Sequence, residues 1–343
     1  MKPAPAVHPV TTHPNPLRHV GVDVSKDTLQ LDAGDLFHGE IPNTPAEIAK
    51  RLKALRKKAP LHVSCEATGP YDRPLVNTCR ALGLPVSRLN PARVAQYRKS
   101  QGIEAKTDRE DAHVIHLFVS KHPPAPLPPP DATRETLRQL HLVRDMLVAQ
   151  RSALSNLRET VSLPVARKPL DAALRALDAR IARLDAQIRR ATDAAEPAFR
   201  GLVGALDGIT GIALLTATKL AAHVPELGTL SRRRAASLSG LAPFPDESGD
   251  WSGPRHIKGG RKPVRDALYM AALTATTHDE VSRGVYQRLV ARGKHHNVAI
   301  TAVMRKLFYH ANCVAARHQR SLVLPAAGTP PADASRGVPN ADA

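Results

Sequence analysis

The stretch HVGVDVSKDTLQLD, residues 19–32, alternates apolar and polar side chains as a β-strand requires. Its three valines (Val20, Val22 and Val24) fall on one face, because successive side chains of a strand point to opposite faces. Asp23 falls on the other face. A tight turn then leads into a second strand. The stretch therefore predicts a β-sheet with an acidic side chain on its polar face.

Strands and helices alternate outward from this stretch as far as residue 121. The segment TPAEIAKRLKALRKK begins with a Thr cap followed by Pro, which is typical of a helix start. We predict strands over 61–68 and 85–90, and helices over 44–58, 70–83, 91–100 and 108–122. Such an alternation is typical of an α/β layer domain.

The next part of the chain is helical in pattern. Leucines and one valine recur every seven residues, and a second segment after Pro164–Pro169 repeats Leu and Ile at steps of three and four. These are the spacings of a coiled-coil seam. Arg144, Arg151 and Arg158 also recur every seven, and two interpretations stay open: a solvated helix face, or a groove for phosphates.

The fold class predicted is α/β followed by α. The Pro-rich run HPPAPLPPP cannot continue a helix and predicts a stiff spacer. Both ends lack periodicity and are rich in Pro and Ala. We expect a disordered tail, an α/β domain, a Pro-rich linker, a coiled-coil segment, a mostly helical domain and a second disordered tail, over 1–18, 19–121, 122–130, 131–199, 200–322 and 323–343.

The chain is strongly basic. Its 343 residues contain 49 Lys and Arg against 31 Asp and Glu, a formal net charge of +18, which predicts nucleic acid as the partner ahead of a membrane surface. Aromatic residues make up 3%, too few for rows of stacked bases. The sequence shows no apolar run long enough for a membrane span, no signal-peptide pattern and no CxxC spacing. We therefore expect a cytoplasmic protein.

Four carboxylates of the α/β domain are placed where a metal site could form. Asp23 lies within a strand, Glu66 ends the strand LHVSCE, and Asp108 and Asp111 are three apart on one predicted helix. Taken singly, Asp23 could be a turn residue and Asp108 a helix cap. A convergent set of carboxylates calls for a cation, and hard oxygen ligands favour Mg²⁺ or Mn²⁺.

Four segments in this order, VGVDVSKDTL, CEATGPY, LNPARV and KTDREDA, resemble the successive motifs of the DEDD transposases of the IS110 insertion-sequence family. Relatives of that family include the Piv-type DNA invertases. The resemblance implies a RuvC-like, ribonuclease-H-type fold for 19–121. It also implies that a metal-binding tetrad falls on Asp23, Glu66, Asp108 and Asp111.

Two segments of the second domain continue the resemblance. LDGITGIALLTATKLAAHV is similar to a helix–hairpin–helix element that turns at Gly208 and Gly211, although an ordinary helical hairpin is the alternative. PDESGDWSGPRHIKGGRK resembles the other signature of this family, in which the serine of a Ser-Gly dipeptide is the nucleophile. The matching position is Ser248, which we favour over Ser252 because it closely follows an SGLAP-type turn and leaves a gap before the basic run.

The basic residues after this serine suit the positioning of phosphates, although a surface charge cluster is the alternative. They are Lys258, Arg261, Lys262 and Arg265.

The resemblance implies a DNA recombinase of the insertion-sequence transposase type that works through a covalent phosphoserine intermediate. It also implies an element-encoded non-coding RNA as partner, and we expect a homo-oligomer, a dimer or a tetramer. Three alternatives stay open: a site-specific DNA invertase, a metal-dependent junction nuclease in which Ser248 is idle, and a non-catalytic nucleic-acid-binding protein.

Overall fold

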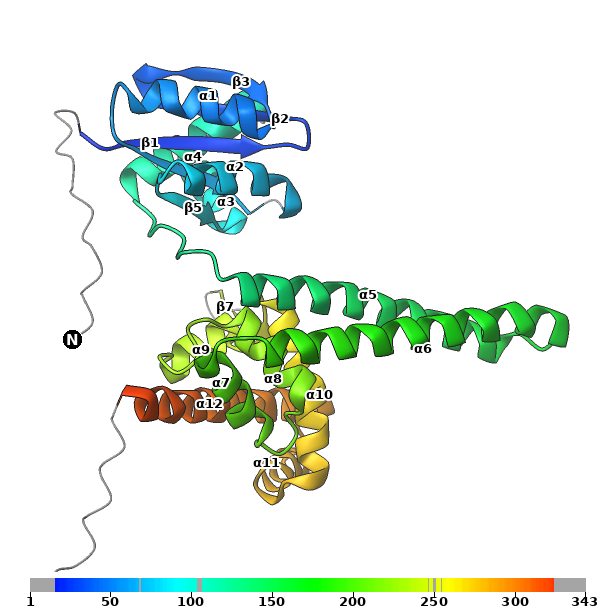
Figure 1. Ribbon diagram of the computed structural model, residues 1–343. Helices are drawn as coiled ribbons and strands as arrows, with labels where there is room; N and C mark the ends of the chain where they lie inside the picture. Colours follow the sequence, from blue (N-terminus) through cyan, green and yellow to red (C-terminus); the bar gives the residue numbers. More distant parts are fainter. Residues whose placement is uncertain are drawn as a thin grey trace, which may run out of the picture. The chain divides into compact units, whose positions relative to one another are not determined.

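The computed structural model describes residues 16–67, 69–103, 107–245, 247–248, 251–253 and 255–323. The chain divides into two compact units, residues 1–129 and 130–343. Figure 1 labels most of the elements of the two units, which are described one at a time below.

The first unit contains a mixed five-stranded sheet in the order β3-β2-β1-β4-β5. Strand β1 pairs antiparallel with β2 and parallel with β4, and β5 continues the parallel side. The strands are β1 (Arg18–Val24), β2 (Thr28–Asp32), β3 (His38–Pro42), β4 (Leu61–Glu66) and β5 (Val86–Leu89). The prediction of a mixed α/β fold is confirmed.

Strand β3 was not expected from the sequence. The segment HGEIP contains Gly and Pro, and only Ile41 is buried, so it lacks the alternating pattern of a strand. It forms because β2 offers a free edge for backbone pairing, with Leu29 opposite Ile41.

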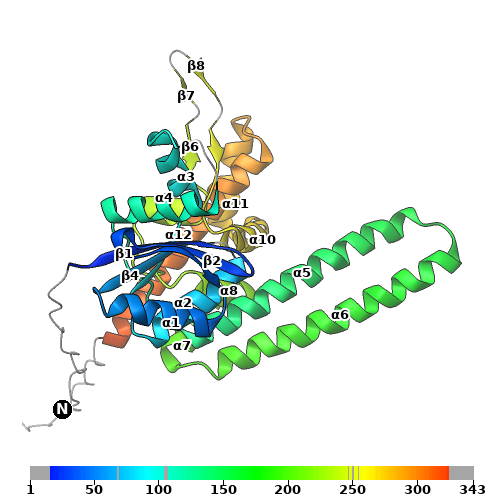
Figure 2. The ribbon, with the colours of Figure 1, turned by 90° about the horizontal axis from the view of Figure 1, so that it is seen from above.

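Helices cover both faces of the sheet, as Figure 2 shows. Helices α1 (Pro45–Arg56) and α2 (Arg73–Ala81) pack on the valine face, in one core cluster with the valines of β1. Helices α3 (Pro91–Ser100) and α4 (Asp108–Lys121) form a separate cluster with Leu89 on the opposite face. The acidic face of β1 therefore lies under α4.

The Pro-rich stretch is attached to the first unit as far as Pro128. Leu127 N–H donates to the carbonyl of Val86 at 2.7 Å, and an Arg80 guanidinium N–H donates to the carbonyl of Pro128 at 3.1 Å. The stretch therefore extends the hydrogen bonding of β5, the edge strand.

The second unit begins with a long helical arm, α5 (Ala132–Thr160) and α6 (Pro164–Asp193), drawn in green in Figure 1. Arg144, Arg151 and Arg158 of α5 form ion pairs with α6, with Asp185, Asp178 and Asp171 respectively. The partner number falls as the arginine number rises, so the helices are antiparallel. These three arginines, the arginine stripe whose interpretation was open in the sequence, therefore join the two helices of the arm.

The second helix of the arm begins earlier than the sequence predicts. We expected it to follow Pro169, but α6 begins at Pro164 and Pro169 lies inside it. Pro169 lies beyond the first turn, so α6 continues through it at the cost of the one hydrogen bond that a residue 169 N–H would donate to the carbonyl of Val165.

The remainder of the second unit is mostly helical, as predicted. Its helices are α7 (Pro197–Asp207), α8 (Leu214–His223), α9 (Arg232–Leu238), α10 (Lys262–His278), α11 (Glu280–Ala291) and α12 (His296–Val323). They share one core that includes Leu206, Leu268 and Phe308. Of the helices described in either unit, none is both long enough and apolar enough to cross a membrane.

Candidate active site

Two of the predicted carboxylates lie at the C-terminal ends of neighbouring parallel strands. Asp23 is the penultimate residue of β1 and Glu66 is the last residue of β4; both are half-buried. The register pairs the residue before Asp23 with the residue before Glu66. Opposed residues of neighbouring strands share a face, so both carboxylates lie on the face of His19 and His62, whose ring centroids are 5.4 Å apart.

Helix α4 lies directly on this face because β1 has a glycine there. A Cβ atom on Gly21 would stand 2.4 Å from the His116 backbone nitrogen and 2.5 Å from the Ala112 carbonyl oxygen. The His116 Nδ1 donates to the carbonyl of His19 at 2.9 Å. Residues 112–116 thus cross β1 from Gly21 back toward His19, so the first turn of α4 extends toward Asp23.

The first turn of α4 carries the other two predicted carboxylates. Thr107 is the N-cap, because its hydroxyl accepts from the Glu110 N–H at 3.3 Å. Asp108 is therefore not the cap, contrary to the alternative left open above, and it is exposed. Asp111 is half-buried and forms an ion pair with Arg98 of α3, a partner that the motifs do not indicate.

The donor chemistry fits a hard divalent cation, but the side chains are not gathered around one point. Carboxylates of β1, β4 and α4 approach the same end of one sheet face, and oxygen ligands suit Mg²⁺ or Mn²⁺. Among the residues that the structure describes, however, three or more His, Cys, Asp or Glu side chains nowhere form a group able to hold a metal ion. Arg98 neutralises Asp111 instead.

A buried polar layer lies on the same sheet face. Ser87 donates to the carbonyl of Ala125 at 2.8 Å and lies 2.8 Å from His62 Nε2, so its oxygen accepts from the imidazole. Burial lowers the pKa of His62, and burial together with the charge of His116 lowers the pKa of His19. Neutral imidazoles there add no positive charge beneath the carboxylates.

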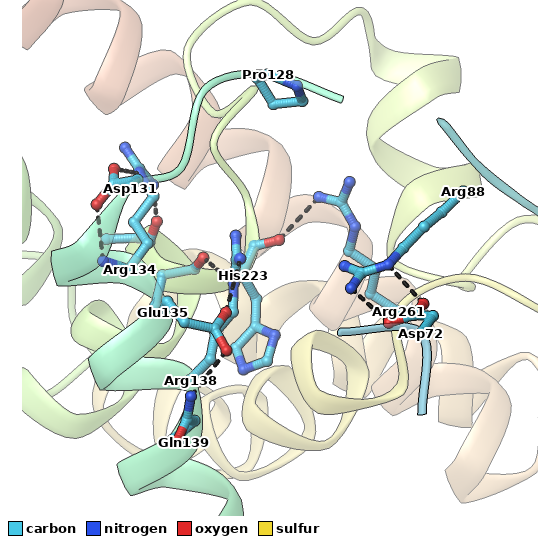
Figure 3. Close-up of polar contacts among 12 residues, drawn as sticks. Asp72, Arg88, Pro128, Asp131, Arg134, Glu135, Arg138, Gln139, His223 and Arg261 are labelled. Carbon is cyan, nitrogen blue, oxygen red and sulfur yellow. Dashed lines mark hydrogen bonds and ion pairs between the residues drawn. The ribbon is translucent and has the colours of Figure 1, made fainter. Parts of the chain in front are cut away.

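Two further buried carboxylates of this unit were not indicated by the sequence motifs. Asp32 is buried and accepts from His113 Nδ1 at 2.7 Å, with His38 Nδ1 3.1 Å away. Asp72 is also buried and is held by Arg88 through two bonds of 2.7 Å, drawn in Figure 3. Asp32 and His38 lie opposite each other in the β2–β3 pair, whereas His113 and Arg88 lie 81 and 16 residues from their partners, so the motifs do not reveal these contacts.

The predicted serine lies on a short two-stranded ribbon of the second unit. Strands β7 (Glu247–Ser248) and β8 (Trp251–Ser252) pair antiparallel, with Ser248 opposite Trp251 and Glu247 opposite Ser252. Strands β6 (Pro243–Phe244) and β9 (His256–Ile257) pair below it, so the ribbon stands beyond them in Figure 2. The side chains of Ser248 and Ser252 lie outside what the structure describes.

The segment from Gly240 to Gly260 carries the ribbon and is called the excursion. The backbones of these two glycines are in contact at its base. Gly240 and Gly260 both have a φ of +68°, and a Cβ atom on Gly260 would stand 2.1 Å from the Gly240 nitrogen. The Arg261 N–H donates to the carbonyl of Leu238 at 2.8 Å. Only glycine lets the two backbones approach this closely, so Ser239–Gly240 and Gly259–Gly260 form the neck of the excursion.

The four predicted phosphate-binding residues lie at this neck, and two of them bind protein groups firmly. Arg261 makes two bonds to Glu226, at 2.7 and 2.8 Å. It also donates to the His223 carbonyl, a bond drawn in Figure 3. Arg265 donates to the carbonyl of Gly259 at 2.6 Å. Lys262 pairs with its helix neighbour Asp266, and Lys258 lies over the Phe244 ring.

The turn between α7 and α8 falls where the sequence resembles a helix–hairpin–helix element. Gly211 has a φ of +93°, and a Cβ atom there would stand 2.5 Å from the Ala271 carbonyl oxygen. Gly208 has a helical φ of −70° and ends α7. The tight turn therefore depends on Gly211, whereas the sequence assigned it to both glycines.

Comparison with known proteins matches both units to transposases. Residues 20–161 match the DEDD transposase model of IS110, described as "Transposase", and residues 204–287 match "Transposase IS116/IS110/IS902 family". The pilin gene-inverting proteins of Moraxella lacunata and Moraxella bovis are each 28% identical over 313 residues, 84% of this chain and 92% of theirs. The transposase for insertion sequence element IS1111A of Coxiella burnetii is 30% identical over 143 residues, 41% of this chain and 37% of its own.

Proposed function

The chain belongs to the IS110 family of transposases, which cut and recombine DNA, and from this premise we propose that it works through a phosphoserine intermediate at Ser248. We further propose that Asp23, Glu66, Asp108 and Asp111 hold a divalent metal ion, Mg²⁺ or Mn²⁺, and that the protein acts in the cytoplasm. The observation that carries the proposal is the placement of acidic strand ends and the first turn of α4 at one end of one sheet face.

The topology of the first unit supports a RuvC-like, ribonuclease-H-type fold. Three antiparallel strands are followed by two parallel ones, with helices on both faces. The turn at Gly211 between α7 and α8 supports a helix–hairpin–helix element in the second unit.

The chemistry proposed for Ser248 conserves phosphodiester bonds. The serine oxygen attacks phosphorus, the bond to one deoxyribose oxygen breaks, and that oxygen leaves as a hydroxyl while the serine proton is given up. Attack by a hydroxyl of the partner strand then reverses these steps and frees the serine. A divalent ion bound by the carboxylates would supply neutralisation of the charge on the phosphate.

The chain's own residues have defined parts in this proposal. The strand ends fix Asp23 and Glu66, and Thr107 orients the turn that carries Asp108 and Asp111. Arg98 holds Asp111 in place through its ion pair and would release it when a cation binds.

We propose that an element-encoded RNA pairs with the DNA and that the protein works as a homo-oligomer, a dimer or a tetramer. The net charge of +18 and the scarcity of aromatic residues support a protein that cradles nucleic acid while base pairing reads the sequence. Four apolar side chains of α5 are exposed, which supports self-association. They are Leu142, Val143, Met146 and Leu157.

Site-specific DNA inversion is the second candidate function. It is favoured by the pilin gene-inverting proteins, whose similarity spans 84% of this chain. DNA flanking the gene distinguishes the two: element ends beside the gene indicate transposition, and a fixed invertible segment indicates inversion.

The test is an SDS-resistant protein–DNA adduct formed by the purified protein on co-expressed flanking DNA, with sequencing of any RNA that copurifies. We expect Ser248→Ala to abolish the adduct and Ser252→Ala, the matched control on the same ribbon, to retain it. Loss in Ser252→Ala alone would move the nucleophile to Ser252. DNA cleavage without any adduct would favour the junction nuclease.

A further inference from the structure

The outward side of α6 carries a line of positive charge. Lys168, Arg175, Arg183 and Arg190 are all exposed. Their spacings of seven, eight and seven residues are close to two helical turns each, so the four side chains share one side of the helix. That side is opposite to the buried Leu177 and thus faces away from α5.

The four side chains form no ion pair within the described arm, although Asp171 attracts Arg175 from one helical turn away. The three aspartates of α6 that face α5 are already paired with the arginines of α5. Within the described part of the arm and the unit around it, no carboxylate lies within ion-pair distance of Lys168, Arg175, Arg183 or Arg190; Arg190 bonds only to its own helix, at Ala186. One side of α6 is therefore matched charge for charge, and the other has a single sign.

The residues between these charges are small. Ala172, Ala179 and Ala186 lie on the same side and are exposed. Alanine lets another backbone come close to the helix, while the long basic side chains reach past it. Between Lys168 and Arg190 this side offers no aromatic or large aliphatic side chain, so this stretch lacks the anchors of a protein interface and the apolar face of a membrane-surface helix; the exposed Val165 lies before it.

The length of the line suits a double helix. Twenty-two residues separate Lys168 from Arg190, which is about 33 Å at 1.5 Å per residue, close to one turn of B-DNA. Neighbouring charges are about 10–12 Å apart, similar to the roughly 12 Å width of the major groove, whose two edges are phosphate backbones.

The arm is also held firmly at its base. Arg138 Nε donates to the carbonyl of Ala222 at 2.8 Å, His141 lies 3.0 Å from the hydroxyl of Thr218, and Lys219 pairs with Asp145 at 2.5 Å. A rod fixed to the core of its unit keeps its line of charge in one orientation.

We propose that the outward face of α6 (Lys168, Arg175, Arg183 and Arg190) binds the phosphate backbone of double-stranded DNA. The inference rests on the action on DNA and is independent of the roles proposed for Ser248 and the four carboxylates.

The test compares two triple variants of the full-length protein for binding a 30-base-pair duplex of arbitrary sequence. One variant is Arg175→Gln with Arg183→Gln and Arg190→Gln. The matched control, Lys50→Gln with Lys53→Gln and Lys57→Gln, removes the same charge from exposed positions of α1 and its C-cap. Glutamine is a good helix former, so both variants should keep the melting temperature and helical circular dichroism of the parent.

We expect the α6 variant to bind the duplex at least 10-fold more weakly at low salt. Its slope of log K against log salt should become shallower by about 2.7, since each lost phosphate contact changes it by about 0.9. The α1 variant should bind like the parent. An unchanged slope for the α6 variant, or a loss confined to a double-stranded RNA of equal length, would overturn the proposal. Abolition of the adduct by Ser248→Ala leaves this binding measurement unaffected, so the two proposals fail separately.

Discussion

The acidic edge of the first unit and the serine ribbon of the second are built in different ways. The carboxylates lie at strand ends and on helix α4. Side chains of α4 belong to a buried core cluster, and its backbone contacts β1 at Gly21. The serine sits on a strand of two residues, at the end of an excursion whose neck is two glycine backbones in contact. The proposed carboxylates are thus positioned by core packing, and the proposed serine by backbone contacts at the neck and the pairing of β6 with β9.

Removing a carboxylate tests the first half of this comparison with the largest expected effect. We expect Asp23→Asn and Glu66→Gln each to slow DNA cleavage by about 10³-fold, equivalent to about 4 kcal/mol, because a neutral amide holds a divalent cation poorly. The measurement is the initial rate of cleavage of a plasmid carrying the flanking DNA.

Glu40→Gln is the control, because Glu40 is exposed on the edge strand β3. It should cleave at the parent rate with an unchanged melting temperature. Cleavage by Asp23→Asn at the parent rate would remove the acidic edge from the chemistry.

The neck of the excursion tests the second half. Gly259 and Gly260 have nearly the same φ, +69° and +68°, but a Cβ atom meets nothing within 4 Å at Gly259 and meets the Gly240 nitrogen at 2.1 Å at Gly260. We expect Gly259→Ala to cost about 1 kcal/mol for the left-handed backbone alone, and Gly260→Ala to cost roughly 1–3 kcal/mol more through overpacking.

Adduct formation should follow the same order, with Gly260→Ala reduced at least 10-fold relative to Gly259→Ala. Both melting temperature and adduct yield are measured. Equal behaviour of the two variants would show that the glycine contact does not position the ribbon.

The last expected effect is a pH dependence that arises at His141 of the second unit. Burial lowers the pKa of His141 to about 4, with the charge of Lys219 contributing. Because the unfolded chain takes up a proton near pH 6.5 and the folded chain does not, this site lowers stability as pH falls from about 6.5 toward 4, by at most about 3 kcal/mol.

Calorimetry between pH 7 and pH 4.5 should show the melting temperature falling less in His141→Gln than in the parent. Glutamine can keep a bond to Thr218 but carries no titratable group. A difference between the two proteins that stays constant with pH would contradict the assignment.

The sequence predicted those parts that depend on local pattern. The valines of β1, the Thr-Pro start of α1 and the seven-residue repeats of the arm are periodic or short-range signals, and the structure has β1, α1, α5 and α6 there. It could not predict β3, which exists only because β2 has a free edge. Nor could it find Arg98 as the partner of Asp111, or the aspartates that take up the arginine stripe, because those contacts depend on tertiary packing.

The sequence also could not show which of the basic residues after Ser248 bind groups of the chain itself. Their sequence spacing indicates a phosphate-binding loop, but Arg261 is occupied by Glu226, 35 positions away, and Arg265 by the carbonyl of Gly259. Charge alone did not distinguish a residue that binds its own chain from one available to a ligand. The α6 face is available in that sense, and no motif pointed to it.

Mass spectrometry of the protein after reaction with its flanking DNA, in the parent and in Asp23→Asn, tests the central claim most directly. If the reaction needs both the strand-end acids and the ribbon hydroxyl, a nucleotide will be found on Ser248 in the parent and will be missing from the variant. A nucleotide on any other residue, or an equal yield in both proteins, would contradict that account.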